Sequence, residues 1–182
     1  PALVDSTADL DLAAERIVGS KFTNAGQTCI APDYVLVDAS VHDALVERMT
    51  EVVDRFYGVT AAQRRASDDY ARLVDAAHWE RVVGLLDEAL EAGATVATGG
   101  TTDADARYVS PTILTDVPLD TSLMRDEIFG PVLPVLPVST IDEAIALVND
   151  RPHPLSLYLF TEREARVETV LAQTTAGSTC IN

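Results

Sequence analysis

Lysine is almost absent from this 182-residue sequence, and acidic residues far outnumber basic ones. Lys21 and twelve arginines stand against 29 aspartates and glutamates, so the formal net charge is −16. Contacts to phosphate groups need clustered lysine and arginine side chains, and the arginines are scattered along the chain. The charge therefore argues against a nucleic-acid partner and against attraction to an anionic membrane surface.

Cysteine and histidine are also scarce. Cys29 and Cys180 are too few for a disulfide scaffold, and with His42, His78 and His153 they show no metal-ligand spacing, so no metal site is predicted. No run of about 18 apolar residues exists, which excludes a membrane-spanning helix. The sequence also lacks a Gly-x-Gly-x-x-Gly motif and a Walker loop, so it predicts no self-contained nucleotide site.

What remains is the composition of an ordinary globular domain, with 47% apolar and 23% charged residues. Strand-like and helix-like segments alternate without a linker, which predicts one α/β domain over residues 1–182. We expect three layers, with helices on both faces of a mainly parallel sheet. The first and last residues, Pro1 and Asn182, resemble the interior of a longer polypeptide, so we expect a fragment.

The segments follow from apolar periodicity and turn residues. Strands are predicted at 1–4, 34–37, 95–98, 108–117, 132–138 and 155–160, with a final apolar run at 178–182. The first helix is predicted to begin in the polar cluster at 5–11 and to end at 24–26. A second helix is predicted over 41–57, and one long helix or two short ones over 70–92. A short helix is predicted near 122–126, and two more helices are predicted to end before 150 and near 173. Residues 59–67 read as a polar loop.

Several local features sharpen these boundaries. Ser40 is predicted to cap the second helix, and the sequences 140–143 and 161–164 each have the Thr-x-x-Glu pattern of a capping box. Pro134 and Pro137 cannot donate to a sheet ladder, so 132–138 is predicted as an edge or irregular strand.

Residues 24–32, Asn-Ala-Gly-Gln-Thr-Cys-Ile-Ala-Pro, place Cys29 on a glycine-containing turn between a helix and a strand. Rigid elements joined by an exposed turn commonly present reactive groups. A thiol needs a base or a positive field to become a nucleophile, and no His, Lys or Glu lies within five residues of Cys29. A catalytic thiol and a buried structural cysteine both remain open, and the second is the commoner case. Cys180 is predicted to be a buried strand residue.

Residues 21–34, Lys-Phe-Thr-Asn-Ala-Gly-Gln-Thr-Cys-Ile-Ala-Pro-Asp-Tyr, resemble the active-site cysteine signature of the aldehyde dehydrogenases. Further matches follow in the same order: the Pro-Thr strand at 107–116, the Glu-x-Phe-Gly-Pro motif at 126–132, and a helix and strand at 142–161. The Ala-Pro-Asp-Tyr continuation is most similar to the class 3 and fatty-aldehyde branch. The resemblance covers essentially the whole chain.

The resemblance implies that Cys29 attacks an aldehyde and that a thioester forms after hydride transfer to NAD or NADP, before water releases a carboxylic acid. The Cys29 N–H and an asparagine side chain would hold the oxyanion. Glu127 matches the residue that accepts from the nicotinamide ribose, and Phe129 the residue beside the nicotinamide. On sequence alone, an exposed carboxylate and an ordinary core ring are the simpler interpretations of these two residues.

The resemblance also shows what is missing. The general-base glutamate of the family lies just upstream of the position that matches Pro1, and the asparagine and most of the dinucleotide-binding domain lie further upstream. The C-terminal segment of the family is absent as well. We therefore expect the isolated chain to be inactive, and the full-length protein to be a cytoplasmic homodimer acting on a small aldehyde.

Two other functions compete with this prediction. Cys29 could serve a cysteine hydrolase or thiol transferase together with His78 or His153. Alternatively, the domain could be a non-catalytic binding or assembly module. Trp79 and Tyr70 are predicted to be core or interface residues on a helix.

Overall fold

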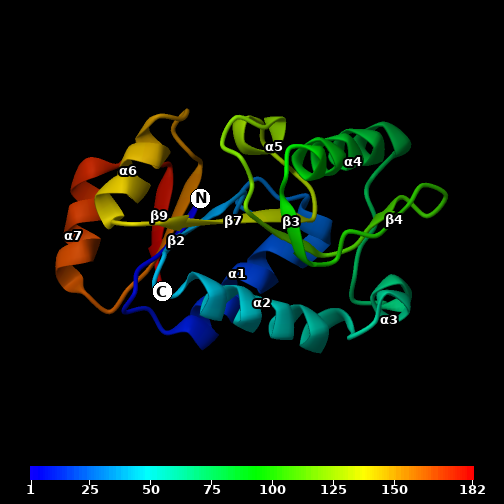
Figure 1. Cartoon of the computed structure of the whole chain (residues 1–182), viewed down its shortest axis with the longest axis horizontal. Helices are drawn as coiled ribbons and strands as arrows, with labels where there is room; N and C mark the ends of the chain where they lie inside the picture. Colours follow the sequence, from blue (N-terminus) through cyan, green and yellow to red (C-terminus); the bar gives the residue numbers. More distant parts are fainter.

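A mostly parallel, seven-stranded sheet forms the centre of the molecule (Figure 1). The computed structural model describes all residues, 1–182. The strands are β1 Ala2–Val4, β2 Val35–Asp38, β3 Thr95–Thr98, β6 Thr112–Thr115, β7 Val132–Val138, β8 Ser156–Phe160 and β9 Ser178–Ile181. They lie in the order β3-β6-β7-β2-β1-β8-β9, and every neighbouring pair is parallel except β3 with β6. A separate hairpin pairs β4 Thr102–Asp103 with β5 Tyr108–Val109.

Helices cover both faces of this sheet. They are α1 Leu10–Phe22, α2 His42–Tyr57, α3 Ala61–Ala66, α4 Ala76–Glu91, α5 Ser122–Arg125, α6 Ile141–Asn149 and α7 Glu164–Gln173, with a short 3-10 turn, η1 Thr23–Gly26, after α1. In Figure 1, α1 and α2 pack together below the sheet, whereas α4, α5 and α6 lie above it. The predicted three-layer α/β fold is confirmed. No helix is both long and apolar enough to span a membrane.

The central strands are apolar because helices cover both of their faces. All three residues of β1 and the first three of β2 are buried. One continuous core of 44 buried apolar residues runs through the whole chain, from β1 to Val170 of α7. Burial on this scale is the main force that holds the sheet and helices together.

β7 lies inside the sheet, between β6 and β2, so its prediction as an edge strand is wrong. Pro134 sits opposite Leu114 of β6, and Pro137 sits opposite Val37 of β2. Each proline removes one backbone donor, but the other five residues of this seven-residue strand keep theirs. The ladder therefore survives on both sides.

Two predicted helix caps are wrong. Ser40 donates its hydroxyl to Asp38 over 2.6 Å, and α2 begins at His42 without a side-chain cap. The Thr161 hydroxyl accepts from the Arg163 N–H and lies 3.3 Å from the Asp5 carboxylate. Because this hydroxyl is engaged at the end of the sheet, α7 starts only at Glu164.

At the other predicted capping box, the Thr140 cap is confirmed, but the reciprocal bond from the Thr140 N–H to Glu143 is not formed. The Thr140 hydroxyl accepts from the Glu143 N–H over 3.1 Å at the start of α6. The Glu143 carboxylate accepts from the Ser139 N–H over 2.7 Å, one residue before the predicted partner. These bonds satisfy donors that a helix start would otherwise leave free.

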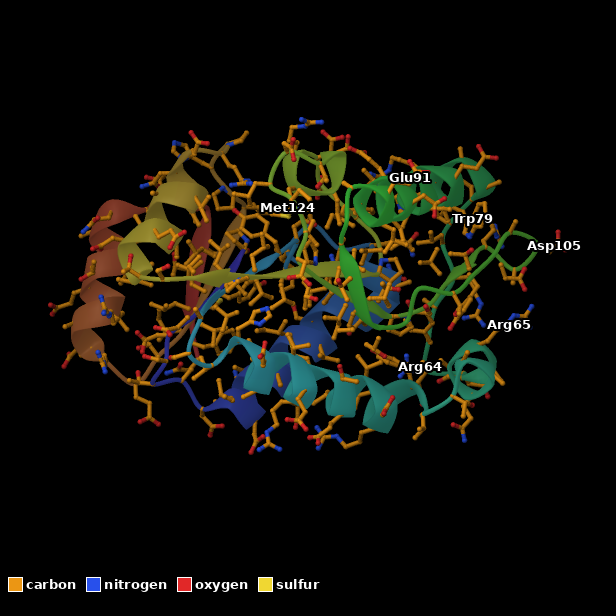
Figure 2. All side chains as sticks on the ribbon, in the orientation of Figure 1. Arg64, Arg65, Trp79, Glu91, Asp105 and Met124 are labelled. Atoms are coloured by element: carbon orange, nitrogen blue, oxygen red, sulfur yellow. The ribbon has the colours of Figure 1, made fainter.

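The predicted helix over 70–92 begins later than expected, at Ala76. The Tyr70 hydroxyl donates to the Val109 carbonyl, and the Leu73 N–H donates to the Arg107 carbonyl, so this stretch is tied to the β4–β5 region. Tyr70 is therefore a core residue in a loop. Trp79 is on α4 as predicted, and its Nε1–H donates to the Tyr108 carbonyl (Figure 2).

The predicted polar loop at 59–67 contains α3. Arg64 is buried there because its guanidinium donates to the Gly58 carbonyl and the Thr98 hydroxyl and pairs with Asp54. The neighbouring Arg65 pairs with Asp103 of the β4–β5 hairpin (Figure 2). These bonds from two arginines explain why a polar segment is ordered.

Cys180 is exposed, so its prediction as a buried residue is wrong. It lies on β9 as expected, but β9 is the last strand of the sheet, and three of its four residues are exposed. Cys29 is exposed as well, and both thiols are free.

Candidate functional site

Pro1 and the loops that precede β2, β7 and β8 meet at the amino ends of the parallel strands β1, β2, β7 and β8. They form an open cleft of about 500 Å³. Pro1, Cys29, Glu127 and Arg151 each come from a different part of the chain and line this cleft, and Leu155 joins them from the same loop as Arg151. The two motifs that the sequence singled out, about a hundred residues apart, therefore contribute to one site.

The chain reverses direction between α1 and Cys29 through three consecutive residues with positive φ. Asn24, Ala25 and Gly26 have φ values of 54°, 53° and 73°. A side chain at Gly26 would place its Cβ 2.3 Å from the Gly130 carbonyl oxygen. Only glycine allows so close an approach, so the Cys29 loop packs directly on the backbone of the Glu-x-Phe-Gly-Pro segment.

Hydrogen bonds to distant segments of the chain fix the Cys29 loop. The Gln27 amide group donates to the Arg72 carbonyl over 3.1 Å and accepts from the Val74 N–H over 2.9 Å. The Tyr158 hydroxyl donates to the Ile30 carbonyl over 2.6 Å. Sequence reasoning missed Gln27 and Tyr158 because a single glutamine or tyrosine carries no pattern that reveals its long-range partners.

Cys29 sits in the turn with its side chain exposed. No protein group forms a hydrogen bond or ion pair with its sulfur, and its backbone N–H has no protein acceptor. A free N–H next to an exposed thiol is the arrangement that can stabilise an oxyanion formed by attack of the sulfur on a carbonyl. The buried structural interpretation of Cys29 is therefore wrong.

Glu127 is exposed in the same cleft, whereas Phe129 is half-buried and does not line the cleft. Phe129 has φ 44°, and its ring packs edge-on against His78, with ring centroids 5.9 Å apart. Bulky residues rarely adopt this conformation, so surrounding contacts must hold it. The structure brings Cys29 and Glu127 together in one cleft and places Phe129 two residues further along the same segment.

The two candidate histidines differ in position. His153 lines the Cys29 cleft. The His78 Nε2 bonds to the Phe129 carbonyl over 2.7 Å, so that nitrogen is already engaged. No group of acidic, histidine or cysteine side chains could hold a metal ion.

Lys21 is the largest electrostatic feature that sequence reasoning missed. Its side chain is fully buried, its amine has no hydrogen-bond partner, and its nitrogen lies 3.8 Å from the Asp33 carboxylate. Burial lowers the pKa of Lys21 to about 8, although the charges of Asp33 and Glu127 oppose this shift. The available signal was its place on the apolar face of α1, after Ile17 and Val18.

Asp33 links this buried amine to the second motif. Its carboxylate accepts from the Ile128 N–H over 3.2 Å. Lys21, Asp33 and Ile128 thus form a polar connection under the cleft, between the segments that carry Cys29 and Glu127.

A model of the aldehyde dehydrogenase family matches residues 1–182. The chain belongs to the aldehyde dehydrogenase family. Its similarity to this family thus covers the thiol-bearing loop, the Glu127 segment and all strands of the sheet.

Relatives with this sequence pattern include members of the class 3 branch. The chain is 42% identical to the dog "Aldehyde dehydrogenase, dimeric NADP-preferring" and 45% identical to the 4,4'-diaponeurosporen-aldehyde dehydrogenase of Staphylococcus aureus, in both cases over its whole length. It spans 38% of each of these proteins. The rat "Aldehyde dehydrogenase family 3 member A2" is 42% identical over 97% of the chain, which spans 35% of that protein.

Solved structures agree with this assignment. The substrate-bound Staphylococcus aureus AldH matches the whole chain with a TM-score of 0.94 and 44% identity, and the chain covers 38% of it. The NADP-dependent glyceraldehyde-3-phosphate dehydrogenase of Bacillus halodurans, complexed with NADP, matches with a TM-score of 0.89 and 35% identity, and the chain covers 37% of it. The resemblance drawn from the sequence motifs is confirmed for family and fold.

Proposed function

We propose that this chain is the thiol-bearing part of an NAD(P)-dependent aldehyde dehydrogenase that oxidises an aldehyde to a carboxylic acid. One observation carries the proposal: an exposed thiol with a free adjacent N–H shares a cleft with Glu127. The domain spans residues 1–182, and the rest of the enzyme lies in segments outside this chain.

In this reaction the Cys29 sulfur, as thiolate, attacks the aldehyde carbon and forms a carbon–sulfur bond. The carbonyl oxygen becomes an oxyanion, and the Cys29 N–H donates to it. One donor placed in this way contributes about 3 kcal/mol to stabilising the transition state. Loss of hydride from the same carbon re-forms the carbonyl bond and leaves a thioester. Water then releases the carboxylic acid and frees the thiol.

The residues at the cleft fit an NAD(P) nicotinamide and its ribose. Glu127 is exposed and acceptor-only when ionised, as a partner of ribose hydroxyls must be. The ring of Phe129 lies two residues away and offers an apolar surface. When bound, NAD(P)+ supplies the hydride acceptor. Glu127 would hold the ribose and Phe129 would limit the movement of the nicotinamide.

The general base is proposed to lie before Pro1. Pro1 lines the same cleft as Cys29, so a residue joined to it would enter the site directly. Three carboxylates line the cleft, those of Asp33, Asp126 and Glu127. Glu127 is assigned to the ribose, Asp33 accepts from the Ile128 N–H, and Asp126 is the residue before Glu127 on the same segment. We therefore expect the 182-residue chain alone to be inactive.

The partners follow the same proposal. The substrate is a small-molecule aldehyde, and the complete enzyme is a homodimer. Several relatives are named "dimeric NADP-preferring", which supports this assembly. Two free thiols favour the reducing cytoplasm as the location.

The decisive experiment compares this chain with a version extended on both sides by its natural flanking residues. The extended protein should reduce NAD+ or NADP+ when given benzaldehyde or hexanal, and the 182-residue chain should not. Cys29→Ala should abolish the activity of the extended protein, whereas Cys180→Ala should preserve it. Activity that survives Cys29→Ala would overturn the proposal.

A cysteine hydrolase is the second candidate because His153 lines the Cys29 cleft. This alternative predicts a burst of nitrophenol from nitrophenyl acetate with the 182-residue chain, lost in both Cys29→Ala and His153→Ala. A burst that persists in His153→Ala would count against it.

A further inference from the structure

One face of α4 contacts four consecutive residues of the segment that carries Glu127 and Phe129. Arg81 donates from Nη1 to the Glu127 carbonyl over 3.1 Å and from Nη2 to the Ile128 carbonyl. His78 bonds through Nε2 to the Phe129 carbonyl over 2.7 Å. A carbonyl can only accept, so His78 must carry a proton on Nε2.

The fourth residue, Gly130, packs on the same helix face. A Cβ at Gly130 would lie 2.7 Å from the side chain of Val82. His78, Arg81 and Val82 stand three and four residues apart on α4, so they share one side of the helix. α4 therefore follows the segment from Glu127 to Gly130 residue by residue.

The hydrogen bonds of Arg81 are directed only at this segment. Arg81 forms no ion pair with any carboxylate, although acidic residues outnumber basic ones in the chain. A guanidinium presents donors in a fixed plane, which suits two adjacent carbonyls better than a lysine amine does.

The opposite side of the segment is also held. The Asp33 carboxylate accepts from the Ile128 N–H, and Gly26 packs on Gly130. The segment thus lies between α4 and the Cys29 loop. Phe129 keeps its positive φ of 44° inside this double contact. Such a conformation persists when the surroundings over-determine it.

We propose that Arg81 and His78 are positioning residues that fix the backbone of residues 127–129 against the Cys29 loop and thereby set the affinity for NAD(P). Neither side chain lines the Cys29 cleft. They act through three backbone carbonyls, and the side chains of Glu127 and Phe129 make the contact with the cofactor. This inference rests on the function proposed above for those two residues.

The first test uses the 182-residue chain and needs no cofactor. Hydrogen exchange of the Ile128 amide reports whether the segment stays fixed. Arg81→Met removes both guanidinium bonds and should speed this exchange about tenfold, with a smaller effect for Arg81→Lys. Amides of β2 should keep their protection, which shows that the variants are folded. Arg55→Met is the matched control, because the exposed Arg55 pairs with Glu15 and stacks on Phe56 but has no bond to residues 127–130.

A second measurement addresses His78 directly. Nitrogen-15 NMR of the wild-type ring should show the proton on Nε2. His78→Gln can still donate to the Phe129 carbonyl and should retain part of the Ile128 protection, whereas His78→Leu should lose it. Equal exchange in His78→Leu, Arg81→Met and the Arg55→Met control would overturn the proposal.

The link to the cofactor is tested in the extended protein. Arg81→Met should raise the KM for NAD(P)+ about tenfold and leave alkylation of Cys29 by iodoacetamide within about twofold of wild type. An unchanged KM would overturn the claim about cofactor affinity. If wild type and Arg55→Met reduce no NAD(P)+ at all, the proposed function fails, and amide exchange alone then decides whether Arg81 and His78 fix the segment.

Discussion

The two ends of the parallel strands differ in how their polar groups are satisfied. At the carboxyl ends, Asp5 is nearly inaccessible and accepts from Thr7 and Thr161, with Arg166 3.5 Å away. The space there is only about 100 Å³. At the amino ends, the cleft is about 500 Å³, the buried Lys21 amine has no hydrogen-bond partner, and the Cys29 N–H is free.

This difference shows where stability and reactivity reside in the domain. Open α/β sheets usually bind ligands beyond the carboxyl ends of their strands. In this chain the carboxyl ends are closed by internal hydrogen bonds, and the groups that could react gather at the opposite end. The loops that precede β2, β7 and β8 therefore hold the groups that could react, and those that follow β1 and β8 hold hydrogen bonds that secure the sheet.

The largest expected effect comes from the contact between the two cleft segments. Gly26→Ala adds a Cβ 2.3 Å from the Gly130 oxygen at a residue with φ 73°. We expect it to lower the free energy of unfolding by about 3 kcal/mol, measured by urea denaturation. Gly84→Ala is the matched control, because Gly84 lies within α4 with nothing near its added Cβ, and it should stabilise the chain by about 0.5–1 kcal/mol. A neutral Gly26→Ala would show that the two segments are not tightly packed.

Because of the buried Lys21, the free energy of unfolding should increase in alkali. Because burial lowers the pKa of Lys21 from 10.5 to about 8, the folded chain releases this proton before the unfolded chain does. Stability from this group therefore rises between pH 8 and 10.5, by about 3 kcal/mol in total. Comparison of wild type with Lys21→Met at pH 7.5 and pH 10 cancels the titration of the tyrosines. If the difference in unfolding free energy between the two proteins did not change with pH, it would contradict a lowered pKa of the buried Lys21 amine.

The carboxyl end should lose stability in acid. Burial raises the pKa of Asp5, but hydrogen bonds from Thr7 and Thr161 and the charge of Arg163 outweigh it, so the pKa lies below the ordinary 3.8. The folded chain therefore holds the ionised form more tightly, and this stabilisation disappears as the pH falls below 3.8.

Asp5→Asn tests this contribution. The substitution should cost about 2 kcal/mol of unfolding free energy at pH 7, since it removes hydrogen bonds to a charged group. The cost should shrink in urea titrations below pH 4. Glu51→Gln is a suitable control, because its carboxylate makes only an exposed pair with Arg48. A loss of stability in Asp5→Asn that is equal at pH 7 and pH 3 would exclude the charge as its source.

The smallest effect concerns the thiols. Cys29 has no base or cation in contact with its sulfur, and Cys180 is also exposed and free. We expect iodoacetamide to modify both at pH 7 within about threefold of each other, at the rate of an ordinary accessible thiol. Mass spectrometry of tryptic peptides over time measures the two rates. A much faster reaction of Cys29 would show that this chain alone activates it.

The sequence predicted the alternation of strands and helices because apolar periodicity depends on the residues themselves. The prediction failed where contacts with residues far away in the sequence determine the local structure. Thr161 has the local pattern of a helix cap, but Asp5, more than 150 residues away, engages its hydroxyl. Pro134 and Pro137 suggested an edge strand, but pairing on both sides overrides the loss of two donors.

The candidate site likewise contains residues that local motifs predicted and residues whose contacts no motif could predict. Cys29, Glu127 and Phe129 came from motifs, and the structure places Cys29 and Glu127 in one cleft. Arg81 and His78 could not be identified as partners of residues 127–129, because nothing in an arginine or histidine on a helix specifies which carbonyls it meets. The contact between Gly26 and Gly130 was hidden for the same reason.

The position of β1 has a consequence for the order of events during synthesis. Ala2–Val4 are synthesised long before β8, yet they occupy an inner place in the sheet, where Ala2 pairs with Val35 on one side and with Tyr158 on the other. One side of the apolar strand β1 therefore stays unpaired until β8, Ser156–Phe160, has been synthesised. Such an open strand invites pairing with a neighbouring nascent chain. Early binding by a chaperone would protect this segment until β8 arrives.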